Sequence, residues 1–99
     1  MIDLEKIIGF EWDDGNARKN EKHGVSTAEA EQIFFNHPLL LLSDVLHSQI
    51  EPRFHALGKT DEGRQLHITF TLRHSDSLIR VISARNMHIK ERAIYEQKD

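Results

Sequence analysis

Arginine and histidine are the side chains of this 99-residue chain that could do chemistry. There is no cysteine to act as a thiol nucleophile, and neither a glycine-rich phosphate loop nor a G-x-S-x-G elbow occurs. Guanidinium groups are always charged and match phosphate oxygens with a two-pronged fork. Histidine carries protons near neutral pH. Each arginine taken singly fits a surface ion pair, but the array taken together favours an anionic, phosphate-bearing ligand.

These side chains lie on predicted elements that could bring them together. In "GRQLHITFTLR", His67, Thr71 and Arg73 alternate with apolar residues and so project from one face of a strand. On the neighbouring strand, simple alternation puts Arg80 and Arg85 on opposite faces unless a β-bulge intervenes. The start of the first of these strands and one face of the last helix add further candidates: Arg64, Arg92 and Tyr95.

The stretch "IRVISAR" (79–85) resembles a central strand, yet it contains two arginines. A guanidinium in a dry core must be offset by a partner. Two interpretations stay open. Arg80 and Arg85 could line an open, anion-binding face of the sheet, or at least one of them could be a structural arginine. The carboxylates considered as its partner are Glu11, Glu91 and Glu96.

The seven histidines form no local metal-binding motif. No H-x-H, H-x₃-H or H-E-x-x-H pair occurs, and such pairs are the usual basis of zinc and iron sites. A site assembled from distant histidines is not the default expectation. We therefore expect no metal ligand and no cofactor.

The first half of the chain predicts a strand followed by two helices. β-branched and aromatic residues favour a strand over 7–12, and Asp13 is a suitable N-cap for a helix that ends near His23. Ala17 is the only apolar residue of this helix, so its polar side chains need another reason to be held. The second helix begins with a capping box and stops before a proline, at Ser26, Glu29 and Pro38.

The second half predicts mostly strands. They are expected over 39–45, 53–58, 64–73 and 79–85, with a hairpin loop at 60–63 and a turn at 74–77. A last helix over 86–97 is expected to face inward with Ile89, Ala93 and Ile94. The order predicts an α+β fold: an N-terminal strand and two helices, an antiparallel sheet of about four to five strands, and a C-terminal helix. The helices should cover one face of the sheet and leave the other open.

Composition and charge indicate a single soluble domain over 1–99. The formal net charge is −3, but acidic residues dominate 1–49 while basic residues, mostly arginine, dominate 50–99. A local basic face on an acidic protein is one interpretation, and a solvated mixed-charge surface is the other. Neither a signal peptide nor an apolar run near the ~20 residues that span a membrane occurs, so we expect a cytoplasmic protein.

Five blocks of the sequence resemble the BrnT toxin family in their order and spacing. They are "FEWDDGNARKNEKHGVS", "RFHALG", "GRQLHITFTLR", "IRVISAR" and "KERAIYE", and together they extend over 10–96. BrnT toxins are the toxic half of type II toxin–antitoxin pairs. The resemblance implies a RelE-like fold and ribonuclease activity. It also implies neutralisation by a BrnA antitoxin whose ribbon-helix-helix part binds DNA, so that the complex represses its own operon.

The resemblance further implies metal-independent RNA cleavage that arrests growth. Such cleavage through 2′-OH attack needs a base, cationic stabilisation of the phosphorane, and an acid for the 5′-oxygen. On the positions that match the family, we expect Arg64 and Arg85 at the scissile phosphate. His23 and Tyr95 are the expected proton-transfer residues. The expected RNA-binding residues are Lys22, Arg73, Arg80 and Arg92.

Two departures from the family pattern bear on activity. Family members often have Glu-Arg-Phe where this chain has "PRF" (52–54), and a second arginine where it has Asn86. If either family residue is catalytic, activity here is reduced or organised differently. The alternative function is a non-catalytic module that binds the antitoxin and acts in operon repression, with DNA contacted only through the antitoxin.

Overall fold

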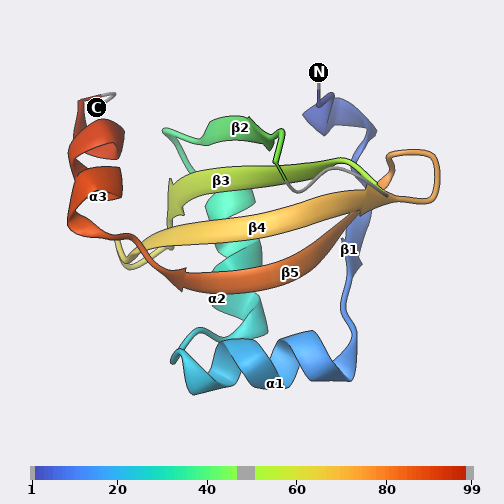
Figure 1. The fold of residues 1–99 in the computed structure, drawn as a ribbon, viewed down its shortest axis with the longest axis horizontal. Helices are drawn as coiled ribbons and strands as arrows, with labels where there is room; N and C mark the ends of the chain where they lie inside the picture. The colour runs from blue at the N-terminus through green and yellow to red at the C-terminus, as the bar shows by residue number, and fades with distance from the viewer. Residues whose placement is uncertain (1, 47–50, 98–99) are drawn as a thin grey trace.

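The computed structural model describes residues 2–46 and 51–97, and within them it contains a five-stranded sheet (Figure 1). The strands are β1 (Gly9–Glu11), β2 (Leu40–Asp44), β3 (Arg53–Lys59), β4 (Gln65–Arg73) and β5 (Leu78–Asn86). The helices are α1 (Asp14–Lys22), α2 (Thr27–Gln32) and α3 (Ile89–Glu96), with short 3-10 helices η1 (Leu4–Lys6) and η2 (Ile33–Phe35). The predicted α+β class and order of elements are confirmed.

The sheet is mixed, whereas the sequence predicted an antiparallel one. Its order is β1-β5-β4-β3-β2, and β2 to β5 form the expected antiparallel meander. β1, however, pairs in parallel with β5, with Phe10 opposite Ile79. The apolar pattern of a three-residue edge strand does not specify the direction of its partner, which is why the sequence missed this pairing.

The helices lie on both faces of the sheet, which corrects the expectation that they share one. Figure 1 shows α2 crossing behind the strands and α3 standing at the end of the sheet where β5 stops. Ile68 and Phe70 of β4 belong to one core cluster with Ala30 of α2. Tyr95 of α3 packs with Leu57 of β3 in a second cluster. Neighbouring residues of β3 point to opposite faces, so each face has its own helix.

The inward face of α3 also differs from the predicted one. Tyr95 is fully buried, whereas Ile89 and Ile94 are 76% and 53% exposed and Ala93 is exposed as well. The Tyr95 hydroxyl donates to the carbonyl of Pro38 at 2.6 Å. A tyrosine ring buries a large apolar area, and here its polar end also finds a partner. These contacts place Tyr95 on the inward face of α3 and leave Ile89 and Ile94 on its outward face.

Hydrogen bonds to β5 explain why α1 is held although it is almost entirely polar. Asn20 is buried, and its side-chain oxygen accepts from the Ala84 N–H at 2.9 Å. The Asn16 side chain donates to the Val81 carbonyl at 3.2 Å. Asp13 caps the helix by accepting from the Asn16 N–H at 2.7 Å. The polar side chains of α1 therefore dock it onto the sheet.

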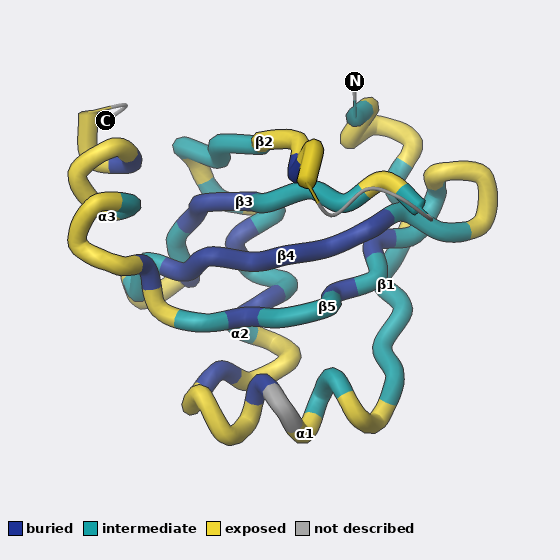
Figure 2. Tube along the Cα trace, viewed as in Figure 1, coloured by how far each residue is buried: buried dark blue, intermediate teal, exposed yellow. Residues whose placement is uncertain are grey.

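The face of the sheet opposite α2 is covered along β4, where an open face was expected. His67, Thr69 and Thr71 are all buried, and Figure 2 shows β4 as a long buried strand. The Thr71 hydroxyl donates to the carbonyl of Pro52 at 2.6 Å, and Glu91 of α3 lies 3.8 Å from His67. The segment before β3 and the helix after β5 thus close over this face.

Candidate functional site

A register shift in the middle of β4 and β5 brings Arg80 and Arg85 to the same face. Arg85 stands opposite His67 and Arg80 opposite Thr71. His67 and Thr71 lie four residues apart on one strand, so they point the same way, and the arginines opposite them do too. The β-bulge, whose presence the sequence alone does not decide, is therefore present. The face opposite α2, which carries these arginines, is called the arginine face below.

Both arginines are paired with carboxylates, and Glu11 and Glu91 are two of the partners considered from the sequence. Arg80 donates to Glu11 at 2.8 Å and to Asp13 at 2.7 Å. Arg85 makes a two-pronged pair with Glu91, at 2.8 and 3.0 Å. These pairs offset the desolvation of the two guanidinium groups.

Arg85, Glu91 and His67 form a charge-coupled cluster beneath α3. The hydrogen bonds from Arg85, helped by the His88 N–H and opposed by burial, lower the pKa of Glu91 to about 2. Burial lowers the pKa of His67 to about 4; the charge of Arg85 acts in the same direction and Glu91 opposes it. Near pH 7, Glu91 is therefore ionised and His67 is neutral.

The predicted arginines are divided between the two ends of the sheet. Arg73 lies at the end of β4 that also carries Arg80, and it pairs with Glu51 at 3.1 Å. Arg64 precedes the opposite end of β4, so an extended strand separates it from Arg73 by roughly 30 Å. Arg85 and Arg92 lie at the Arg64 end, since β5 ends there and α3 follows. A single phosphate cannot contact both groups.

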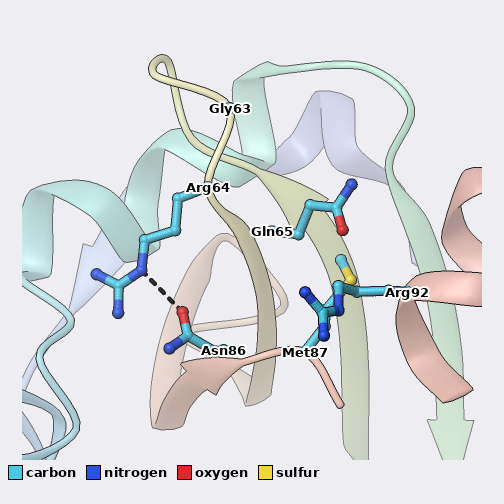
Figure 3. Close-up of a pocket in the computed structure, with 6 residues that line it drawn as sticks. All are labelled: Gly63, Arg64, Gln65, Asn86, Met87 and Arg92. Carbon is cyan, nitrogen blue, oxygen red and sulfur yellow. Dashed lines mark hydrogen bonds between the residues drawn. The ribbon is translucent and has the colours of Figure 1, made fainter. Parts of the chain in front are cut away.

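A pocket at the Arg64 end of the sheet contains two of the predicted arginines (Figure 3). Its volume is about 550 Å³, and it is lined by Gly63, Arg64, Gln65, Asn86, Met87 and Arg92. Figure 3 shows the guanidinium groups of Arg64 and Arg92 on opposite sides of Asn86, with Arg92 extending from α3. No residue in the described part of the chain pairs with the Arg92 side chain. An anion entering this pocket meets positive charge from two elements.

Asn86 connects this pocket to Arg85. Its side-chain oxygen accepts from Arg64 Nε at 2.8 Å, and its backbone carbonyl accepts from Arg85 Nη1 at 3.0 Å. The two arginines expected at the scissile phosphate therefore both bond to Asn86, Arg64 to its side chain and Arg85 to its backbone. Asn86 stands where family members often have arginine, so the departure noted in the sequence removes a charge and supplies an acceptor that orients Arg64.

Residues around the α1–α2 turn fix the other side of Arg64. Arg64 Nη1 donates to the Gly24 carbonyl at 2.6 Å and to both Glu29 oxygens at 3.1 and 3.2 Å. The Ser26 N–H and, after it, Arg64 lower the pKa of Glu29 against the opposing effect of burial. Two predicted residues, Lys22 and His23, directly precede Gly24 and are exposed at the end of α1. The structure thus places the end of α1 beside the pocket.

Tyr95 lies apart from this arrangement. Its side chain is fully buried, and its hydroxyl donates to the Pro38 carbonyl. A group that transfers a proton must reach the reacting atoms, and this hydroxyl faces the protein interior. We assign Tyr95 to the packing of α3 and leave it out of the proposed chemistry.

Sequence reasoning missed the acidic and amide residues that orient the arginines. Glu29 was recognised only as a capping residue, although its capping box lies next to the turn that Arg64 contacts. Asn86 was noted only as a departure from the family. Charge alone gives no signal for these roles, because they depend on which turn meets the start of β4.

Within 2–46 and 51–97, no group of three or more His, Cys, Asp or Glu side chains could hold a metal ion. Of the seven histidines, His47 lies outside the described residues. No helix in this part of the chain is long and apolar enough to cross a membrane.

Fold and site together define a small α+β protein with a mixed five-stranded sheet and an arginine-lined pocket at one end. A family model described as "Ribonuclease toxin, BrnT, of type II toxin-antitoxin system" matches residues 12–91. The chain belongs to this family, which confirms the resemblance seen in the sequence. Membership in a type II toxin–antitoxin family implies an antitoxin partner.

A solved structure supports the fold. The crystal structure of the Brucella abortus ribonuclease toxin, BrnT, is similar with a TM-score of 0.55 and 20% sequence identity, covering 82% of this chain and 97% of that chain. No curated protein matches the chain. The α+β architecture is thus shared with a BrnT structure, and the RelE-like comparison stays a prediction compatible with it.

Proposed function

We propose that this protein is a metal-independent endoribonuclease that acts in the cytoplasm and arrests growth. A BrnA-like antitoxin with a ribbon-helix-helix part neutralises it, and DNA is contacted only through that antitoxin. The observation that carries the proposal is the meeting of Arg64 and Arg85 at Asn86, beside a pocket that Arg92 enters from the other side. Guanidinium groups held at this end of the sheet suit the charge that develops on a phosphorane.

The site residues divide into two groups in this proposal. The scissile phosphate lies at Arg64 and Arg85, with Arg92 and Lys22 holding the flanking backbone and His23 transferring a proton. At the far end of the arginine face, Arg73 and Arg80 contact more distant nucleotides. Arg73 keeps its pair with Glu51 and Arg80 keeps its pairs with Glu11 and Asp13, so both contact phosphate only with their remaining N–H groups.

The test of this function is cleavage of RNA by purified protein in the presence of a chelator. Arg92→Ala is the informative variant, because Arg92 is exposed and its loss leaves no buried carboxylate behind. We expect kcat/KM to fall about 10-fold or more, since a charge-assisted hydrogen bond contributes about 1.5–3 kcal/mol. The matched control is Arg18→Ala, which removes an exposed arginine from a different helix, α1. This variant should cleave normally.

Growth measurements complete this test. Induced expression of the wild type should arrest growth with early RNA fragmentation, and Arg85→Ala should abolish both. Cleavage that stops when the chelator is added would contradict the metal-independent mechanism.

The alternative is a non-catalytic module that binds the antitoxin and acts in operon repression. The carboxylate pairs of Arg73, Arg80 and Arg85 favour it, because they neutralise much of the arginine face. Under this alternative, a folded wild type leaves RNA intact and growth unaffected while still binding the antitoxin tightly.

A further inference from the structure

The arginine face carries an Asp–His–hydroxyl arrangement that the chemistry described above does not use. His55 of β3 lies between Asp44 of β2 and Thr69 of β4. Its Nε2 is 3.0 Å from Asp44 Oδ2, and its Nδ1 is 3.0 Å from Thr69 Oγ1. The His55 side chain is 28% exposed, whereas Asp44 and Thr69 are buried. An imidazole that solvent can reach is therefore oriented by buried groups on both sides.

The two partners determine the tautomer of His55. An ionised carboxylate only accepts hydrogen bonds, so Nε2 carries the proton and donates to Asp44. Nδ1 is then the acceptor, and the Thr69 hydroxyl donates to it. A buried aspartate that orients a histidine in this way prepares it to act as a general base.

This arrangement lies within reach of the proposed phosphate site. The ring of His67 lies against that of His55 in a tilted arrangement, with centroids 4.8 Å apart, and His67 stands opposite Arg85. β3 and β5 are two strand spacings apart, roughly 10 Å. His55 and Arg85 lie on the same face of the sheet, and in this proposal the ribose next to a phosphate bound at Arg85 directs its 2′-OH toward His55.

We propose that His55 is the general base of the ribonuclease reaction and that Asp44 is its positioning residue, an inference that rests on the function proposed above. The 2′-OH takes the place of the Thr69 hydroxyl at His55 Nδ1 and gives its proton to that nitrogen. The 2′-oxygen bonds to phosphorus, the bond from phosphorus to the 5′-oxygen breaks, and the imidazolium of His23 protonates the leaving oxygen. The products are a 2′,3′-cyclic phosphate and a 5′-hydroxyl, and exchange with water restores both histidines.

Charged and titratable groups surround His55 on each neighbouring element. The groups are Asp44 from β2, Arg53 from β3 itself, His67 from β4, Arg85 from β5 and Glu91 from α3.

The test compares cleavage of a short RNA by the purified full-length wild type and two variants over a range of pH. His55→Asn should lower kcat by about 10²-fold or more and abolish the loss of rate seen when the base becomes protonated. Asp44→Asn should have a similar effect with little change in KM, because an amide that donates to Nε2 moves the histidine proton to Nδ1. His37→Gln, an exposed histidine away from the site, should cleave like the wild type.

The outcomes separate this inference from the function on which it rests. If the wild type cleaves no RNA, both are overturned. If the wild type cleaves and both variants stay within about threefold of it, only the role of His55 is overturned. Should a variant fail to fold, nitrogen NMR of the wild type decides the case, because a proton found on Nδ1 of His55 would overturn the proposal and one on Nε2 would support it.

Discussion

Asn20 is the residue on which the docking of α1 depends most. Its buried side chain accepts a hydrogen bond from the Ala84 N–H of β5. Asn20→Ala leaves that N–H unpaired in the interior, so the free energy of unfolding should fall by about 1–3 kcal/mol. Urea unfolding measures this change. Glu21→Ala, exposed on the same helix, should change stability by less than about 0.5 kcal/mol, and equal losses in both variants would contradict the role of Asn20.

His67 should make the stability of the protein depend on pH. Burial, with the charge of Arg85, lowers its pKa from 6.5 to about 4 in the folded state. Between these values the unfolded chain binds a proton that the folded chain does not. The free energy of unfolding should therefore decrease as pH falls from about 6.5 to about 4, by at most about 3 kcal/mol.

Thermal or urea unfolding from pH 7 to pH 4 tests this dependence against His67→Gln. The variant should lose the slope between about pH 6.5 and 4, whereas an unchanged slope would assign it to other groups. Glu91 does not contribute to the slope of stability against pH over most of the range from pH 6.5 to pH 4. Its pKa is lowered from 4.5 to about 2, so its contribution is complete above about pH 4.5 and is lost only below that value.

Among the elements, α3 is docked mainly through Tyr95. Tyr95→Phe keeps the buried ring and removes the hydroxyl bond to Pro38, so stability should fall by about 1–2 kcal/mol. Because the hydroxyl faces the interior, kcat/KM for RNA should stay within about threefold of the wild type. Parallel unfolding and cleavage assays check both parts. A large loss of cleavage with little loss of stability would restore the proton-transfer role that the sequence suggested.

The same helix controls the charge of Arg85 through Glu91. Glu91→Gln removes the carboxylate that neutralises Arg85, so an uncleavable 2′-deoxy oligonucleotide should bind severalfold more tightly at low salt. Fluorescence anisotropy measures the change in Kd. Glu62→Gln, in the exposed β3–β4 loop, removes one negative charge away from the arginine pairs and is the matched control. Equal gains in both variants would indicate a general charge effect and not the release of Arg85.

For the whole molecule, internal ion pairing should make RNA binding only weakly dependent on salt. Arg73, Arg80 and Arg85 are all paired with carboxylates, and the net charge is −3. Each phosphate neutralised on single-stranded RNA contributes about −0.7 to the slope of log K against log salt. We expect a slope of about −1 to −2. A slope steeper than about −4 would show that these pairs open on binding.

Local patterns in the chain predicted most of the elements correctly. The capping box of Ser26 and Glu29 begins α2, Asp13 caps α1, and the alternation along β4 separates core residues from polar ones, all as expected. These features involve residues a few positions apart, so they follow from sequence alone. The family blocks likewise depend only on residue identity and spacing, and the family match confirms them.

Contacts between distant segments decided the rest. The parallel pairing of β1 with β5, the bulge that turns Arg80 and Arg85 to one face, and the inward turn of Tyr95 all depend on neighbours tens of residues away. The same holds for the site. The sequence named Arg64 and Arg85, but only the fold joins them at Asn86, because a guanidinium takes whichever acceptors tertiary packing brings within reach.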